Sequence, residues 1–158
     1  DLPNSKILIL YRNPIQHAYS LLFQHKRFIE DSKKDSFISN YMKWIGHTEF
    51  GPNYIPIHHK NLCFEDNLNI NHWLEQWYLT YYDCLKNIEE KDNAYMICYE
   101  QLCASKKYWL DILKLLDIKE SYDFEFKESK KEISLDIEND IRDKALSLYS
   151  EISDIALG

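Results

Sequence analysis

Glycine is scarce in this chain of 158 residues, which contains only Gly46, Gly51 and Gly158. A Gly-x-x-x-x-Gly-Lys pattern is absent, so the printed residues include no phosphate-binding loop of that type. A Gly-x-Ser-x-Gly pattern is absent too, which argues against a hydrolase with a nucleophile elbow. Long apolar runs are also lacking, so the sequence predicts no membrane-spanning helix.

Positive charge is in the minority, since 19 Lys and Arg residues face 26 Asp and Glu residues and the net charge is −7. Binding to a nucleic-acid backbone needs a concentrated cationic surface, so we expect no nucleic-acid partner. The charge is uneven, because residues 1–27 are net positive through Lys6, Arg12, Lys26 and Arg27. This part of the chain can still hold a local anion site.

The four cysteines form no CxxC pair and have no regular spacing, which favours buried free thiols in a reducing compartment. Residues 1–4 carry neither a basic leader nor an apolar signal region, so we expect a cytoplasmic protein. The spacing of the remaining candidate metal ligands matches no standard zinc site, and we predict no metal centre. These candidates are His47, His58, His59, Cys63 and Glu65.

The stretch "KILILYRNPIQHAYSLL" predicts a strand, a turn and a helix. The continuous apolar run favours a strand over Lys6–Tyr11 that is buried on both faces. Asn13 is a good N-cap and Pro14 suits the first helical position, so a helix is expected from Pro14 to about Phe28. Its apolar face is expected to comprise Ile15, Ala18, Tyr19, Leu22 and Phe23, opposite Gln16, Ser20, Gln24 and Arg27.

The rest of the chain predicts further helices and one more strand. The clearest stripe, from Ile70 to Ile88, is rich in aromatic residues and is expected to face the core. The other expected elements are a loop at 30–36, a helix at 37–51, a long irregular segment at 51–67, a strand at 94–99, a helix at 105–116, a loop at 122–133 and a helix at 135–157.

Two strands that are each followed by a helix indicate one α/β domain with a parallel sheet, largely helical, over residues 1–158. Ligands of such sheets bind outside the carboxyl ends of the strands. Arg12 and Tyr99 both lie at the carboxyl end of an expected strand and therefore belong to that edge.

An arginine beside a helix N-terminus can offer several N–H donors to a phosphate, and Ser20 on the following helix can donate to the same group. The alternative is structural: Arg12 pairs with a carboxylate such as Glu100, and Ser20 is a solvated helix residue. The residues alone leave both readings open.

The run Lys6-Ile-Leu-Ile-Leu-Tyr-Arg-Asn-Pro, followed by Ser20 and then by His25 and Arg27, resembles the second signature of the sulfotransferases that use 3′-phosphoadenosine 5′-phosphosulfate (PAPS). The segment "NAYMICYEQLCASKKYWLDILKLLDI", residues 93–118, resembles the family's later strand, its Tyr-Glu pair and the next helix. The resemblance implies a P-loop-NTPase-like fold. It also implies that Arg12 and Ser20 bind the 3′-phosphate of the nucleotide and that Tyr99 lines the nucleotide site.

The same resemblance implies an enzyme that transfers a sulfuryl group from PAPS to a hydroxyl or amine and releases adenosine 3′,5′-bisphosphate. In the family, a lysine-bearing phosphosulfate loop and a catalytic base, usually a histidine, precede the arginine signature. Neither is found in the printed residues, so we expect this chain to be the later part of a sulfotransferase domain. Its expected partners are the cofactor, an unknown acceptor, and either the preceding segment or a second copy of the chain.

The resemblance leaves several residues with two readings. Members carry a basic segment near the C-terminus over the 3′-phosphate, and Lys127, Lys130 and Lys131 either serve this role or form a solvated charge run. The region after the serine helix contributes to acceptor binding in the family, which makes Trp44, His47 and Tyr54 candidates for either pocket or packing.

Two other functions compete with sulfuryl transfer. One is a related P-loop nucleotide phosphotransferase, in which Arg12 contacts a nucleotide phosphate. The other is a non-catalytic helical interaction module. The acceptor class and the catalytic base are not assigned by the sequence.

Overall fold

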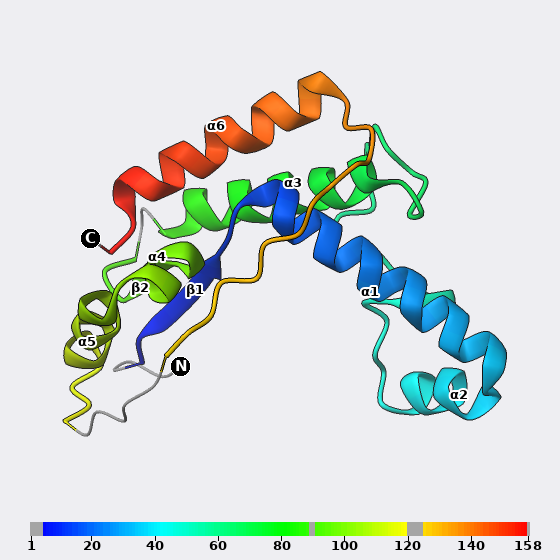
Figure 1. Ribbon diagram of the computed structural model, residues 1–158, viewed down its shortest axis with the longest axis horizontal. Helices are drawn as coiled ribbons and strands as arrows, with labels where there is room; N and C mark the ends of the chain where they lie inside the picture. The colour runs from blue at the N-terminus through cyan, green and yellow to red at the C-terminus, as the bar shows by residue number, and fades with distance from the viewer. Residues whose placement is uncertain (1–4, 89–90, 120–124, 158) are drawn as a thin grey trace.

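The computed structural model describes residues 5–88, 91–119 and 125–157 (Figure 1). Expectations that concern residues 1–4 and 122–124 lie outside these ranges. Most of the described chain is helical, with a small parallel sheet. None of the described helices is long and apolar enough to cross a membrane.

The sheet in the described residues consists of β1 (Ile7–Tyr11) and β2 (Ala94–Cys98). The strands pair in parallel, from Ile7 opposite Ala94 to Tyr11 opposite Cys98. The expected α/β arrangement with parallel strands is therefore confirmed at this coarse level. The register also brings the residues that follow the two strands to one edge of the sheet.

The expectation that β1 is buried on both faces is wrong. Tyr11 is fully buried, whereas Ile7 is 44% exposed and Leu10 is 51% exposed. The reason is that the described residues cover β1 mainly by pairing with β2, and they place no complete layer over its other side chains.

The first helix, α1 (Pro14–Lys34), starts as expected and runs beyond Phe28. The side chain of Asn13 accepts hydrogen bonds from the backbone N–H groups of Ile15 and Gln16, both at 3.1 Å. The predicted loop at 30–36 is wrong, because residues 30–34 continue the helix. Polar residues can extend an exposed helix through neighbouring charges, as in the 3.6 Å pair between Arg27 and Asp31.

The next helix, α2 (Ser36–Trp44), ends before the expected boundary at residue 51. Gly46 adopts φ +68°, and the N–H of His47 donates to the carbonyl of Met42, which closes the helix end. The aromatic side of α2 is not buried, since Phe37 is 58% exposed and Trp44 is 74% exposed. The described elements place nothing over this side of α2.

The segment after α2 is irregular, as expected, apart from a short 3₁₀ helix, η1 (Gly51–Asn53). η1 is fixed against α1 because the Gly51 N–H donates to Nδ1 of buried His25 at 3.2 Å. Gly51 has φ +83°, and a Cβ there would approach the Cβ of Phe28 at 3.2 Å. This close contact explains glycine at the position.

The aromatic helix α3 (Ile70–Ile88) has the bounds that the sequence predicts, and its stripe lies in the core. Trp73, Trp77 and Tyr81 are all buried. Figure 1 shows α3 between α1 and α6 (Asn139–Ile155), and both helices pack against it. The hydrophobic core is therefore built around α3 rather than around the small sheet.

The C-terminal half differs from expectation mainly at helix boundaries. α4 (Tyr99–Ala104) follows β2 directly and was not predicted, whereas α5 (Lys106–Leu115) was. α6 begins later than expected, and it buries Ile141, Ala145, Leu148 and Ile152 while Ile155 is 51% exposed. We call residues 125–137 the strap. It has no regular helix or strand and passes beside β1 and the start of α1 (Figure 1).

Candidate functional site

Arg12 and Tyr99 lie together at the carboxyl edge of the sheet. Arg12 directly follows β1, and Tyr99 directly follows β2. The guanidinium carbon of Arg12 is 4.9 Å from the centroid of the Tyr99 ring. This contact is a cation–π arrangement, and it holds the guanidinium where both strands end.

The guanidinium retains an unused donor. One terminal nitrogen, Nη2, donates to the carbonyl of Ser129 in the strap. The inner nitrogen, Nε, is enclosed and has no hydrogen-bond partner among the described residues. An enclosed N–H without an acceptor costs free energy, so the site is suited to an additional acceptor such as an anion.

The alternative pairing of Arg12 with Glu100 is not what the structure shows. Glu100 instead accepts from the backbone N–H of Asn13 at 2.9 Å and from the hydroxyl of Tyr149 at 3.3 Å. Across residues 5–88, 91–119 and 125–157, no carboxylate lies within ion-pair distance of Arg12. The arginine charge is therefore not neutralised by a described acidic side chain.

Ser20 is half-buried on α1, two turns beyond Arg12. Its hydroxyl donates to the carbonyl of Gln16 at 2.9 Å, within the helix. The structure therefore does not show Ser20 in contact with Arg12. A serine hydroxyl rotates readily and keeps free acceptor capacity, so this bond does not prevent a second interaction.

The strap is anchored on both elements of the site. The hydroxyl of Tyr99 donates to the carbonyl of Lys127 and accepts from the N–H of Ser129, both at 3.1 Å. The amide of Gln16 donates to the carbonyl of Lys131 at 2.9 Å and accepts from the N–H of Lys131 at 3.0 Å. The strap thus joins the start of α1 to the start of α4.

The strap also carries the lysines that the sequence left with two readings. Lys131 extends over α1, with its ammonium 4.7 Å from the centroid of the Phe23 ring. Lys130 pairs with Glu128 at 3.2 Å and is exposed, which is typical of a solvated charge. The structure therefore brings these lysines to the neighbourhood of the Arg12 site without a direct contact to Arg12.

A separate apolar cavity of about 280 Å³ lies between α1, α3 and the segment after α2. Tyr54, one of the predicted pocket candidates, contributes to its wall. Trp44 is mostly exposed instead, and Nδ1 of His47 contacts the carboxylate of Glu49 at 2.5 Å. The lining consists of His17, Leu21, Glu49, Phe50, Tyr54, Ile55, Ile57, Trp73, Gln76, Trp77, Thr80 and Tyr81.

Three residues of this cavity have an altered acidity: burial raises the pKa of Tyr54 and of Tyr81 to about 12, and the third residue is His17. Burial lowers the pKa of its imidazole from 6.5 to about 4, and the nearby Arg12 lowers it further while Glu100 opposes the change. The ring is therefore neutral at pH 7. Neither ring nitrogen has a hydrogen-bond partner in the described part of the chain, and Nδ1 is enclosed.

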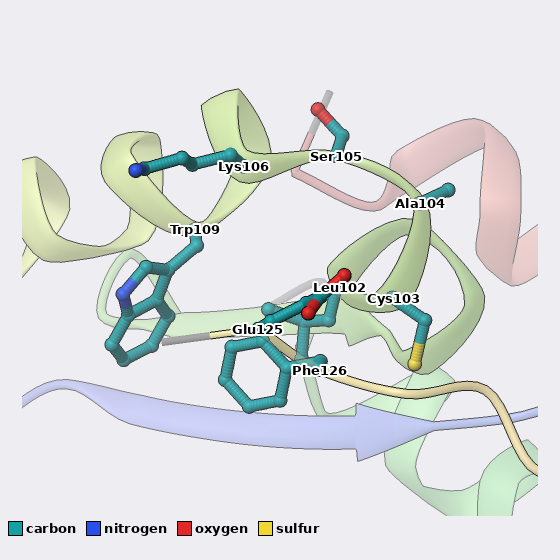
Figure 2. A pocket seen from close by; sticks show the side chains of 8 residues that line it. All are labelled: Leu102, Cys103, Ala104, Ser105, Lys106, Trp109, Glu125 and Phe126. Atoms are coloured by element: carbon teal, nitrogen blue, oxygen red, sulfur yellow. The ribbon is translucent and has the colours of Figure 1, made fainter. Parts of the chain in front are cut away.

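A larger cavity of about 570 Å³ lies beside α4 and α5, and the start of the strap completes its wall (Figure 2). The indole of Trp109 faces the ring of Phe126, with 5.4 Å between the ring centroids. The lining is mostly polar and comprises Leu102, Cys103, Ala104, Ser105, Lys106, Trp109, Glu125 and Phe126. None of the predicted site residues borders this cavity.

The histidines and cysteines that suggested a metal site are dispersed. His58 lies near Asp83 at 3.9 Å, whereas Glu75 accepts from the backbone N–H groups of Cys63 and Phe64. In the described ranges, no group of three His, Cys, Asp or Glu residues is arranged to hold a metal ion. All four cysteines are free thiols; Cys98 is buried, but Cys63 is exposed, contrary to the expectation of burial.

The sequence did not predict the roles of Gln16 and His17. Both lie on α1 within the same turn after Arg12, but Gln16 faces the strap and His17 faces α3. The sequence offered one indication of these roles, namely that Gln16 and His17 lie close in the chain to Arg12, which was expected at the edge of the sheet. No residue pattern indicated which partner would be reached.

Comparison with known proteins found no family model, no curated protein and no solved structure that matches this chain. The case for a function therefore depends on the residues and on how they are arranged.

Proposed function

We propose that this chain supplies the 3′-phosphate-binding part of a PAPS-dependent sulfotransferase with a P-loop-like α/β fold. The observation that supports this proposal most is the placement of Arg12 against Tyr99 at the shared edge of the parallel strands. Each residue comes from one of the two segments that resemble the family. The parallel pairing of β1 with β2 brings the two residues together.

The chemistry of the site is compatible with a phosphate. Arg12 is the cation, and its enclosed Nε is a donor that no described residue accepts from. The Ser20 hydroxyl lies on the helix that starts beside it. Tyr99 holds the guanidinium from one side. Arg12 and Ser20 would hold the nucleotide, and Tyr99 would line its site.

The nucleotide, when bound, supplies the sulfuryl group that a hydroxyl or amine acceptor receives. Arg12, Ser20 and Tyr99 act in this proposal by binding and orientation, which can account for a large part of a transfer reaction's acceleration. They are not the base that takes the acceptor's proton, and no described residue is assigned that role.

Calorimetric titration with adenosine 3′,5′-bisphosphate and with 5′-AMP tests the proposal. The wild-type chain is expected to prefer the bisphosphate, because only that ligand carries the 3′-phosphate. Arg12→Ala should weaken bisphosphate binding about 10- to 100-fold, the effect of losing a charge-assisted hydrogen bond.

Arg27→Ala is the matched control, since Arg27 is an exposed arginine on the same helix that pairs with Asp31. It should leave the affinity unchanged. Equal affinity of the wild type for both ligands, or no binding of either, would contradict the proposal. A preference for ATP with Mg²⁺ would instead indicate a nucleotide phosphotransferase.

A helical interaction module is the second candidate, and the exposed aromatic side of α2 favours it. Phe37 and Trp44 contact each other in an edge-on arrangement while both remain largely exposed. A module of this kind would lose partner binding on Trp44→Ser and keep it on Arg12→Ala. Pull-down with the two variants distinguishes this candidate from the enzyme.

A further inference from the structure

Glu100, the second residue of α4, accepts hydrogen bonds from three separate parts of the chain. Its Oε1 accepts from the backbone N–H of Asn13 at 2.9 Å. Its Oε2 accepts from the hydroxyl of Tyr149 at 3.3 Å and from the thiol of Cys98 at 3.5 Å. These donors belong to the turn before α1, to α6 and to the end of β2, so the carboxylate joins three elements at the carboxyl edge of the sheet.

The carboxylate of Glu100 is held by these hydrogen bonds rather than by a cation. Glu100 is half-buried, and no Lys, Arg or His in residues 5–88, 91–119 and 125–157 lies within ion-pair distance of it. A carboxylate that is partly removed from water is costly unless donors satisfy its oxygens. The three donors meet that need, and in return each of them is fixed in place.

The bond to Asn13 fixes the backbone that carries Arg12. The N–H of Asn13 belongs to the peptide group that joins Arg12 to Asn13, and a peptide group is planar, so holding its N–H sets the direction in which the chain leaves Arg12. The helix offers this N–H no acceptor, because Asn13 is the N-cap of α1 and intrahelical acceptors lie four residues earlier. Among the described residues, Glu100 supplies the acceptor.

The two consecutive residues at the start of α4 thus act on different parts of Arg12. Tyr99 contacts the guanidinium, 4.9 Å from its ring centroid, whereas Glu100 holds the backbone from which the side chain extends. The other described contact of the guanidinium is to the carbonyl of Ser129 in the strap. The bond from Asn13 to Glu100 therefore restrains the position of Arg12 independently of the strap.

We propose that Glu100 is a positioning residue of the Arg12 site, which acts through the backbone of Asn13 and does not touch the bound anion. This inference rests on the proposed binding of a nucleotide 3′-phosphate at Arg12. Without the bond, the backbone at Arg12 has to be ordered when the anion binds, and that ordering lowers the affinity.

Calorimetric titration of the full chain with adenosine 3′,5′-bisphosphate tests the proposal. Glu100→Ala should bind about tenfold more weakly than the wild type, the effect of losing one hydrogen bond to a charged group. Glu100→Gln keeps a side-chain oxygen that can accept from Asn13 and removes a negative charge near the anion. It should therefore bind at least as tightly as the wild type, so a loss in Glu100→Ala does not come from the missing charge.

Tyr149→Phe is the matched control, because it removes one donor from the same carboxylate and leaves the bond to Asn13. It should lower the melting temperature and keep the wild-type affinity. Glu100→Asp retains the charge and is one methylene shorter, so it should also weaken binding and serves as the test where Glu100→Ala does not fold.

Hydrogen exchange of the Asn13 amide, followed by NMR without ligand, measures the bond itself. Exchange should be slow in the wild type and in Glu100→Gln, and about tenfold faster in Glu100→Ala, the effect of one lost hydrogen bond. The same rate in Glu100→Ala and the wild type would show that Glu100 does not hold this backbone.

Two binding results would also overturn the inference. One is wild-type affinity in folded Glu100→Ala and Glu100→Asp, and the other is an equal loss of affinity in Tyr149→Phe. If the wild type binds the bisphosphate, these results overturn this inference alone. Absence of binding by the wild type would overturn the proposed function and this inference together.

Discussion

Arg12 and His17 are five positions apart in the chain, but their surroundings are opposite. Arg12 is stacked on Tyr99 and faces the strap, and it keeps its positive charge. His17 lies against α3, where its ring centroid is 6.4 Å from that of Tyr81. A short stretch of chain around the start of α1 therefore separates a positively charged side chain from a neutral one, because the two positions face different neighbours.

The burial of His17 predicts a pH-dependent stability. Its pKa in the folded chain is about 4, below the ordinary 6.5, so the unfolded chain binds a proton that the folded chain excludes. The stabilising contribution is complete above pH 6.5 and is lost as the pH falls toward 4. The expected loss is about 2 to 3 kcal/mol of the free energy of unfolding.

Urea unfolding of the wild type and of His17→Phe at pH 7 and pH 4.5 measures this difference. The variant should lose less stability on acidification than the wild type does. An NMR titration that places the pKa of His17 near 6.5 would refute the expectation.

At the level of the element, substitutions in α6 can show which side of this helix faces the core. Ile152 is fully buried, whereas Ile155, three positions further along the helix, is 51% exposed. Ile152→Ala should cost about 2 to 5 kcal/mol, because it leaves a cavity in the core. Ile155→Ala is the matched control and should change the free energy of unfolding by less than about 0.5 kcal/mol in chemical denaturation. Equal costs at the two positions would mean that α6 is rotated from the described arrangement.

The strap is an element held by a few side chains rather than by its own backbone bonds. Gln16 makes two hydrogen bonds to Lys131, so Gln16→Ala should release this part of the strap without unfolding the core. Trypsin should then cleave after Lys127, Lys130 or Lys131 about tenfold faster, the effect of losing about 1.4 kcal/mol of local stability.

Mass spectrometry of the fragments over time measures that rate. Gln24→Ala, at a half-buried position further along α1, is the control and should be cleaved like the wild type. Unchanged cleavage in Gln16→Ala would show that Gln16 does not hold the strap.

At the scale of the whole molecule, the partly uncovered strand β1 is the main irregularity. Leu10 is 51% exposed, and exposed apolar strands promote pairing between chains. We expect concentration-dependent self-association, measured by light scattering after size-exclusion chromatography.

Leu10→Lys should reduce this self-association, because a lysine on the strand opposes close contact between copies. Leu110→Lys, at a leucine of α5 that is 43% exposed, is the matched control and should associate like the wild type. A monomeric wild type at every concentration would contradict the expectation.

Much of the fold follows from local sequence. Asn13 and Pro14 start α1, the aromatic spacing of residues 70–88 gives α3, and the apolar run gives β1. These features depend on residues close together in the chain, so they can be recognised in the sequence without knowledge of the tertiary structure. Helix ends were less predictable, as at residues 30–34, because a polar exposed helix has no apolar period to mark its end.

The sequence alone determined that Arg12 and Tyr99 each lie at the end of a strand, and the expected parallel pairing placed both residues at one edge of the sheet. Only the tertiary structure decided that the Arg12 guanidinium donates a hydrogen bond to Ser129 and that Gln16 forms hydrogen bonds with Lys131. The first contact spans 117 positions of the chain, and the second spans 115. It also decided that His17 borders an aromatic cavity and that β1 and α2 keep exposed apolar side chains. Such outcomes depend on which surfaces remain to cover one another after the elements form, and no local pattern encodes that choice.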